Sequence, residues 1–204
     1  MNSVFIHIPK TGGLTIEAAL HLISLRHHAR INNRKEKYGK LKGNLSFGHM
    51  DYRKLLRDGY ISEELNRDSF KYAFCRNPYD RAVSHWCYCM KKHPGIIKKG
   101  TPFLEFSRQI YDNKKKKHFR EQYLYIDGIR IDFQGRFENY MEDLQKIADM
   151  IGVNLQSIPH ENGTSHKPYY EYYCEESKNN IKNFYKKDFE YFGYDINDNL
   201  LHRW

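Results

Sequence analysis

Short apolar runs alternate along this chain with longer stretches in which apolar residues recur at helical spacing. The run at 4–8 is too short for a helix and is rich in β-forming residues, so it predicts a buried strand. Runs of the same kind predict further strands at 45–49, 70–75 and 132–137. Each predicted strand lies close to a stretch with the period of a helix.

The helical stretches begin and end at residues that commonly cap helices. Asp51 is suited to cap a helix that runs through Leu56, and Asn77 followed by Pro78 is suited to start a longer one. Gly152 is suited to end another. The helices expected from the pattern are 14–25, 51–56, about 79–91, 103–111, 140–151 and one near 181–189.

Alternation of strands and helices predicts an α/β fold with a mostly parallel sheet flanked by helices. The 204 residues contain no internal repeat and no Pro-rich or Gly/Ser-rich linker, so we expect a single domain over residues 1–204. In such sheets, ligands bind at the carboxyl ends of the strands. Candidate chemistry is therefore sought where strands end.

The composition narrows the classes of partner. The chain has 34 Lys and Arg against 25 Asp and Glu, a formal net charge of +9, which favours an anionic partner. No apolar run approaches the ~20 residues of a membrane span, and residues 1–9 do not resemble a secretory signal. We therefore expect no transmembrane segment and a cytoplasmic protein.

The four cysteines, at 75, 87, 89 and 174, are too few for a disulfide framework in a chain of this length. The Cys-x-Cys pair at 87 and 89 has no second ligand pair at zinc-finger spacing. We therefore expect free thiols and no bound metal.

The first predicted strand runs into a glycine turn that opens a helix. In residues 9–15, here called the glycine loop, glycines let backbone N–H groups approach an anion, and a lysine and two threonines add donors. These sequence features predict a phosphate site, although a tight turn with a solvated lysine remains the alternative. The order is not that of a Walker A motif, because the lysine precedes the glycines. The candidate ligands are Lys10, Thr11, Gly12, Gly13, Leu14 and Thr15.

A second junction of strand and helix follows Cys75. Arg76 stands where the strand ends, and a guanidinium there is suited to a phosphate. Ser84 lies on the helix that follows. The alternative is that Asp80 pairs locally with an arginine and Ser84 simply packs. Two anion sites, each where a strand ends and a helix begins, suit a ligand with two separated phosphates.

Together these segments resemble the sulfotransferases that use 3′-phosphoadenosine 5′-phosphosulfate (PAPS). Residues 5–13 look like the 5′-phosphosulfate loop of that family, and residues 76–84 look like its 3′-phosphate motif. Gly48-His49 is similar to the segment with the catalytic histidine, and residues 135–139 and 188–194 also look familial. The likeness is greatest to the membrane-type carbohydrate enzymes, particularly the 2-O-sulfotransferases.

The resemblance implies a sulfotransferase fold, with a sheet similar to that of P-loop NTPases. It also implies in-line transfer of a sulfuryl group from PAPS to an acceptor hydroxyl. PAP would be the product, and no metal would be required. Lys10 would stabilise the leaving phosphate oxygen, and His49 would accept the acceptor proton. Arg76 and Ser84 would hold the 3′-phosphate, and Lys167 would contact the nucleotide from a polar loop at 164–168. His7 would pack or hydrogen-bond beneath the glycine loop.

The chain departs from the 2-O-sulfotransferases at Phe47, where that branch has a second histidine. The sequence does not identify the acceptor. The basic run 114–118 is either a solvated face or a surface that attracts an anionic glycan or glycolipid. Two other functions stay as alternatives, a P-loop-like small-molecule kinase that uses ATP and a basic nucleic-acid-binding protein. A family relic that binds nucleotide without transfer is a further alternative.

Overall fold

The computed structural model describes residues 2–24, 43–59, 61–92, 97–114, 116–155 and 166–198. Contacts within the chain divide it into two compact units. The first unit consists of Met1–Cys75 and Leu124–Asn162, and the second of 76–123 and 163–204. Each unit has its own buried core.

The first unit is built on a parallel sheet. Its order is β2-β3-β1-β4-β5, and every pair of neighbours is parallel, which confirms the predicted α/β class. The register sets His7 beside Gly48 and Cys75 beside Arg136. The strands are β1 (Ser3–His7), β2 (Ile23–Ser24), β3 (Asn44–Gly48), β4 (Phe70–Cys75) and β5 (Phe133–Arg136). Four of them lie within one or two residues of the predicted runs.

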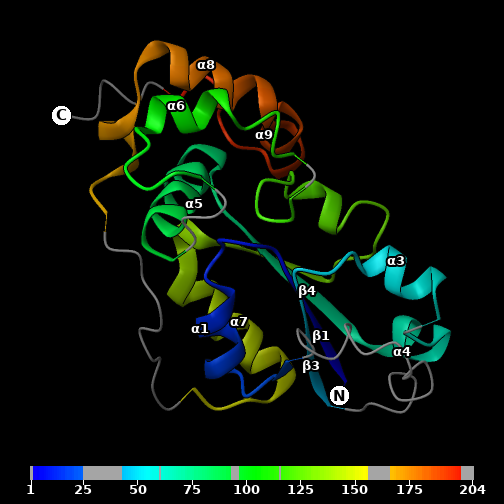
Figure 1. The fold of residues 1–204 in the computed structure, drawn as a ribbon. Helices are drawn as coiled ribbons and strands as arrows, with labels where there is room; N and C mark the ends of the chain where they lie inside the picture. The colour runs from blue at the N-terminus through cyan, green and yellow to red at the C-terminus, as the bar shows by residue number, and fades with distance from the viewer. Residues whose placement is uncertain are drawn as a thin grey trace. The chain divides into compact units, whose positions relative to one another are not determined.

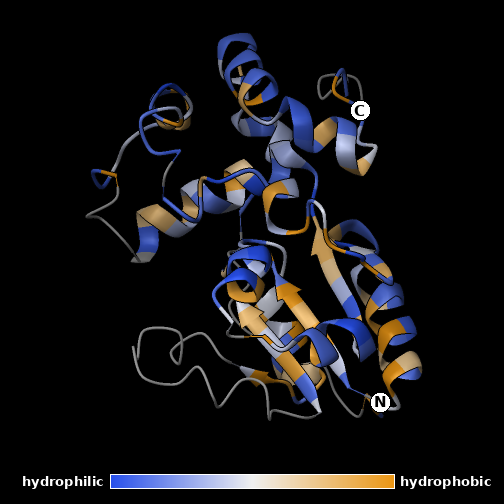
Figure 2. Ribbon diagram, turned by 90° about the vertical axis from the view of Figure 1, so that its right-hand side faces the viewer, coloured by the Kyte–Doolittle hydropathy of each residue, from blue (hydrophilic) through white to orange (hydrophobic). Residues whose placement is uncertain are grey.

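Two helices, α1 (Gly13–Ala19) and α7 (Tyr140–Ile151), lie together against one face of the sheet (Figure 1). Figure 2 shows the hydrophobic colours gathered on the strands and on the sides of the helices that meet them. The cluster on this face joins strand and helix residues: Phe5, Tyr72, Phe74, Ile16, Leu20, Leu144, Ile147 and Ala148. Gly152 ends α7 in the left-handed conformation, as predicted.

Two shorter helices, α3 (Tyr52–Arg57) and α4 (Glu63–Asp68), follow β3. The carboxylate of Asp51 caps α3 by accepting a hydrogen bond from the Lys54 amide, which confirms the predicted cap. Ser62 caps α4 in the same way, through the amide of Leu65. The sequence analysis missed α4, because this short, mostly charged segment has too few apolar residues to show a period.

The helix predicted at 14–25 is wrong beyond Ala19. His21 adopts a left-handed backbone with φ of 50°, which no α-helix continues through. The chain then pairs Ile23 with Leu45 as the edge strand β2, and the Ile23 side chain is exposed. Apolar residues that we assigned to one helical face therefore belong to two elements.

The second unit is helical. Its elements are α5 (Pro78–Lys92), α6 (Phe103–Arg108), the 3-10 turn η4 (Tyr169–Tyr172), α8 (Glu175–Phe184) and α9 (Lys186–Phe192). Asn77 begins α5 by accepting a hydrogen bond from the Tyr79 amide, as predicted. The single helix expected near 181–189 is two helices, because the chain bends at Tyr185 between α8 and α9. Short 3-10 turns also occur at η2 (Tyr123–Tyr125) and η3 (Phe137–Asn139).

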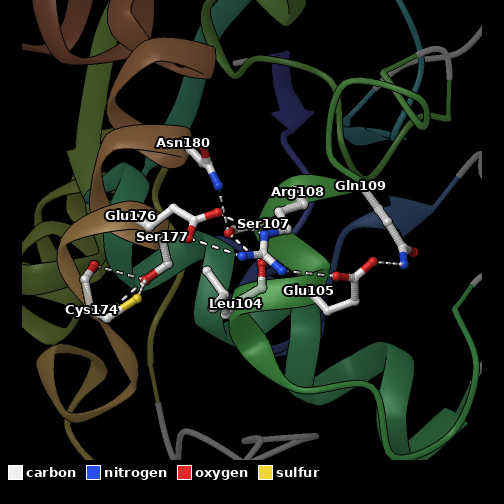
Figure 3. A network of polar contacts seen from close by, with 9 residues as sticks. All are labelled: Leu104, Glu105, Ser107, Arg108, Gln109, Cys174, Glu176, Ser177 and Asn180. Atoms are coloured by element: carbon white, nitrogen blue, oxygen red, sulfur yellow. Dashed lines mark hydrogen bonds and ion pairs between the residues drawn. The ribbon is translucent and has the colours of Figure 1, made fainter.

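Polar contacts join α6 to α8 on the surface of this unit (Figure 3). Arg108 donates two hydrogen bonds to the carboxylate of Glu176, at 2.7 and 2.9 Å. The Ser107 hydroxyl accepts from the Asn180 amide at 3.1 Å and donates to the Leu104 carbonyl. The two parallel hydrogen bonds from Arg108 to Glu176 favour one register between α6 and α8.

All four cysteines are free thiols, as expected, and three of them are buried. Within the residues that the structure describes, no helix is long and apolar enough to cross a membrane.

Candidate active site

The glycine loop connects β1 to α1 through two residues with left-handed backbones. Lys10 has a φ of 71° and Gly12 a φ of 81°. Tyr140 of α7 packs on Gly12 so closely that a Cβ there would lie 2.6 Å from its ring, and its hydroxyl donates to the Gly12 carbonyl at 2.8 Å. Burial raises the pKa of Tyr140, so this hydroxyl keeps its proton. Only glycine fits at residue 12.

The backbone amides of the loop form a group of unsatisfied donors. Among the described residues, the N–H groups of residues 11–14 donate no hydrogen bond, whereas those of Thr15 and Ile16 donate to the Gly12 carbonyl. Consecutive unpaired amides at a glycine turn are a typical cradle for an anionic oxygen. Lys10 stands directly before them in the chain and adds a full positive charge.

The side chains of the loop differ in what they offer to a ligand. The Thr11 side chain is buried and its hydroxyl donates to the Ile8 carbonyl at 2.9 Å, so its amide remains as the donor. Thr15 lies in the first turn of α1 with 9% of its surface exposed, and Leu14 is 36% exposed. Of the two predicted hydroxyl donors, the structure therefore commits that of Thr11 to the loop itself.

A buried polar group lies beneath the loop. The His7 ring, at the end of β1, is 2.7 Å from Glu17 through its Nδ1 atom, and the Ser46 hydroxyl donates to the same carboxylate oxygen at 2.7 Å. All three side chains are less than 10% exposed. The other side of the ring lies against Gly13, where a Cβ would overlap Nε2. The prediction that His7 lies beneath the loop is confirmed.

His49 follows β3 and lies beside His7. Its amide donates to the His7 carbonyl at 3.1 Å, and its ring meets the His7 ring edge-on at a centroid distance of 4.5 Å. Its backbone is left-handed, with φ of 56°. Phe47, the position where the resembled branch has a second histidine, is instead buried against Tyr52 of α3. The histidine that accompanies His49 in space therefore comes from β1.

Arg76 is the first residue of the second unit and follows directly on β4. Its backbone amide and carbonyl are both bonded to the side chain of Gln122, at 3.0 and 2.9 Å. Its Nε atom is 2.7 Å from Asp80, so the local pairing considered as an alternative does form. Ser84, one turn beyond Asp80 in α5, is 2% exposed.

The remaining candidate ligand, Lys167, lies on the surface of the second unit. Its side chain is 73% exposed and pairs with Glu171 at 3.2 Å, while its amide donates to the Tyr172 hydroxyl. Residues 164 and 165 of its loop lie outside the described residues. In the basic run, Lys114, Lys116 and Lys117 are exposed and Lys115 is not described.

Sequence reasoning missed the residues that support these candidates. Glu17 occupies a polar position within an otherwise apolar helix, a signal that was available. Asp188, fully buried in α9, accepts the amides of Gln122 and Tyr123 at 2.8 and 2.9 Å. Burial raises the pKa of Asp188 to about 6. No sequence pattern pointed to Gln122 or Tyr140 as parts of a site.

A cavity of about 270 Å³ in the first unit is not part of this group. It is lined by Leu56, Asn66, Arg67, Lys71, Gly128, Ile129 and Arg130. Lys71 is near the amino end of β4, opposite the strand ends that carry the glycine loop and His49. Within the described ranges, no three His, Cys, Asp or Glu side chains are grouped to hold a metal ion.

The fold and the loop geometry together define a class of protein: an α/β domain with a parallel sheet and a glycine loop between its first strand and first helix. The chain matches the model of the Sulfotransferase family over residues 2–195, and it belongs to that family. The resemblance seen in the motifs is thereby confirmed at the level of the family, and the protein is a transferase of sulfuryl groups. Comparisons with curated proteins and with solved structures gave no match.

Proposed function

We propose that the protein transfers the sulfuryl group of PAPS to a hydroxyl of a carbohydrate, with His49 as the base. One observation carries the proposal: unpaired amides lie beside Lys10 at the end of β1, and His49 lies at the end of the adjacent strand. The parallel sheet brings these two strand ends together. Such a reaction needs a binding site for the phosphosulfate group and a base for the acceptor hydroxyl.

The glycine loop fits the 5′ end of the donor. When bound, PAPS supplies a sulfuryl group attached to a phosphate that is a good leaving group. The amides of Gly12, Gly13 and Leu14 and the ammonium of Lys10 bind that phosphate and stabilise the charge that develops on its oxygen. Thr15 adds its hydroxyl. Transfer of this kind resembles phosphoryl transfer, in which positioning and electrostatics do most of the work.

His49 accepts the proton of the attacking hydroxyl. The bond between sulfur and the acceptor oxygen forms as the bond between sulfur and the phosphate oxygen breaks, and the proton passes to the imidazole. A histidine is suited to this role because its ordinary pKa of about 6.5 leaves it mostly neutral at pH 7.

Arg76 recognises the 3′-phosphate, with Ser84 as a second donor and Lys167 as a contact from the surface loop. The pair with Asp80 holds the Arg76 guanidinium in one orientation. Removing the 3′-phosphate from the ligand would leave these donors without their partner, which is how a site rejects an analogue. This contact is what would make the protein select PAPS over ATP.

The acceptor is proposed to be a carbohydrate, and the exposed basic run that includes Lys114, Lys116 and Lys117 favours an anionic one. Long-range attraction by such a run depends on salt. Family membership favours sulfuryl transfer over the kinase and nucleic-acid-binding alternatives.

The test is calorimetric titration with PAP, ATP–Mg²⁺ and AMP. We expect tight binding of PAP alone, without any metal. Arg76→Ala should weaken the binding of PAP at least tenfold and leave the affinity for AMP unchanged, because only PAP carries the 3′-phosphate. Arg130→Ala, which removes an exposed arginine at the cavity far from the loop, is the matched control.

Preferential binding of ATP–Mg²⁺ would support the kinase function instead. An equal loss of affinity for PAP and for AMP in Arg76→Ala would remove Arg76 from its proposed role. His49→Ala should bind PAP as the wild type does but release no PAP from PAPS. Retained turnover in that variant would assign the base to another residue.

A further inference from the structure

We propose that Glu17 and His7 form a buried positioning pair that sets the orientation of the His49 ring. The proposal rests on the assignment of His49 as the base in the proposed function. Neither member of the pair needs to touch the substrate, because both act through residues they contact. Four observations, all within the first unit, carry it.

The first is the state of Glu17. Its side chain is 7% exposed and its Oε1 atom accepts the Ser46 hydroxyl while lying 2.7 Å from His7 Nδ1. An oxygen that already accepts one hydrogen bond, on a buried carboxylate, is best satisfied by a second donor. Glu17 therefore holds the proton of His7 on Nδ1, which fixes the tautomer of the ring.

The second is the position of the His7 ring. The ring stacks on Phe5 at a centroid distance of 5.4 Å, with its Nδ1 edge on Glu17 and its Nε2 edge against Gly13. Three neighbours, one from β1 and two from α1, thus hold the ring in this orientation.

The third is the contact between the two histidines. His49 donates its amide to the His7 carbonyl, and the two rings meet at 4.5 Å with planes 74° apart. His7 therefore contacts His49 through backbone and side chain alike.

The fourth is the strained backbone of His49, with φ of 56°. Residues other than glycine adopt this conformation at an energetic cost and keep it only where the surroundings hold it. His7 supplies that support. A purely packing role explains the arrangement poorly, because apolar side chains would fill the space without the cost of burying a carboxylate, an imidazole and a hydroxyl.

The test combines Glu17→Gln with a matched control. Gln keeps the size of Glu17 but removes the charge and lets an amide donate to Nδ1. Asp143→Asn neutralises an equally buried carboxylate of the same unit, which accepts the Arg136 amide and contacts Lys146 instead. Both variants are made in the full chain.

The first readout is the long-range ¹H–¹⁵N NMR spectrum of the histidine rings, which needs no substrate. The wild type should show His7 with its proton on Nδ1. Glu17→Gln should shift the His7 tautomer and move the ring resonances of His49, and Asp143→Asn should move neither. His7 protonated on Nε2 alone in the wild type would overturn the proposal, and this result does not depend on how well any variant folds.

The second readout is release of PAP from PAPS with water as the acceptor. There the bond from sulfur to the phosphate oxygen breaks, a bond from sulfur to the water oxygen forms, and His49 takes the proton. Glu17→Gln should lower kcat by roughly 10- to 100-fold, the effect usual for a residue that orients another. The KM for PAPS and the calorimetric affinity for PAP should change less than about threefold.

An equal loss of kcat in Asp143→Asn would show general destabilisation and overturn the proposal. So would a Glu17→Gln variant with wild-type His49 resonances and wild-type kcat. If the wild-type protein binds no PAP, the proposed function fails instead, and the NMR comparison still decides whether Glu17 positions His7 and His49.

Discussion

Two adjacent glycines in the loop are required for different physical reasons. Gly12 has a left-handed backbone beneath Tyr140, so both its φ of 81° and the space around it exclude a side chain. Gly13 begins α1, and the atoms nearest to a Cβ placed there all belong to the His7 ring. The second case predicts that the requirement can be removed by changing His7.

Gly13→Ala should lower the free energy of unfolding by about 1–3 kcal/mol, the usual cost of an extra methyl group in a packed site. In a His7→Ala background the same change should cost at least about 1 kcal/mol less, because the overlapping ring is gone. Urea unfolding of the four proteins measures this cycle. Equal costs in both backgrounds would mean that the methyl group meets something other than His7.

A second residue-scale prediction concerns Asp188, whose pKa burial raises from 3.8 to about 6. The folded protein then binds more protons at this carboxyl than the unfolded chain does between pH 4 and 6, so stability falls as the pH rises through that window. The unfolding free energy of the wild type, relative to Asp188→Asn, should drop by up to about 3 kcal/mol from pH 4 to pH 7. A flat difference would mean that the amides of Gln122 and Tyr123 offset the burial.

At the scale of elements, the sequence was most informative where one element carries one pattern. β4 was predicted at its observed bounds because Phe70, Tyr72 and Phe74 recur at every second position beside polar segments, and α7 because its apolar period runs unbroken to Gly152. The prediction at 14–25 failed because the backbone of His21 is left-handed and the residues after it pair with β3 as the strand β2. No local pattern encodes that choice.

The same distinction between local and long-range information separates the predictable residues of the candidate site from those that were missed. The glycine loop, His49 and Arg76 were predictable because each lies at the end of a strand that its own sequence reveals. Glu17, Tyr140 and Gln122 were not, since their roles depend on partners 10, 128 and 46 residues away along the chain. The local ion pair of Arg76 with Asp80, four residues apart, was foreseen as an alternative and is present.

At the scale of the whole molecule, neither unit is a continuous segment. The chain passes between them at 75–76, 123–124 and 162–163, so neither can be synthesised alone as one stretch of sequence. Discontinuous units connected three times are expected to fold together, which is the single domain that we proposed for residues 1–204. Trp86, in α5 of the second unit, provides a probe of this coupling.

Ala148→Gly in α7 of the first unit should destabilise its helix by about 1 kcal/mol. If the molecule unfolds as one, that change lowers the midpoint of the thermal transition seen by Trp86 fluorescence by about 2–4 °C, the shift usual for a domain of this size. The measurement uses a Trp204→Phe background, so that Trp86 is the only tryptophan. An unchanged Trp86 midpoint, alongside a lower midpoint for calorimetric unfolding of the first unit, would mean that the two units are separate domains. Coincident transitions by both probes would mean that a ligand held by either unit stabilises the whole chain.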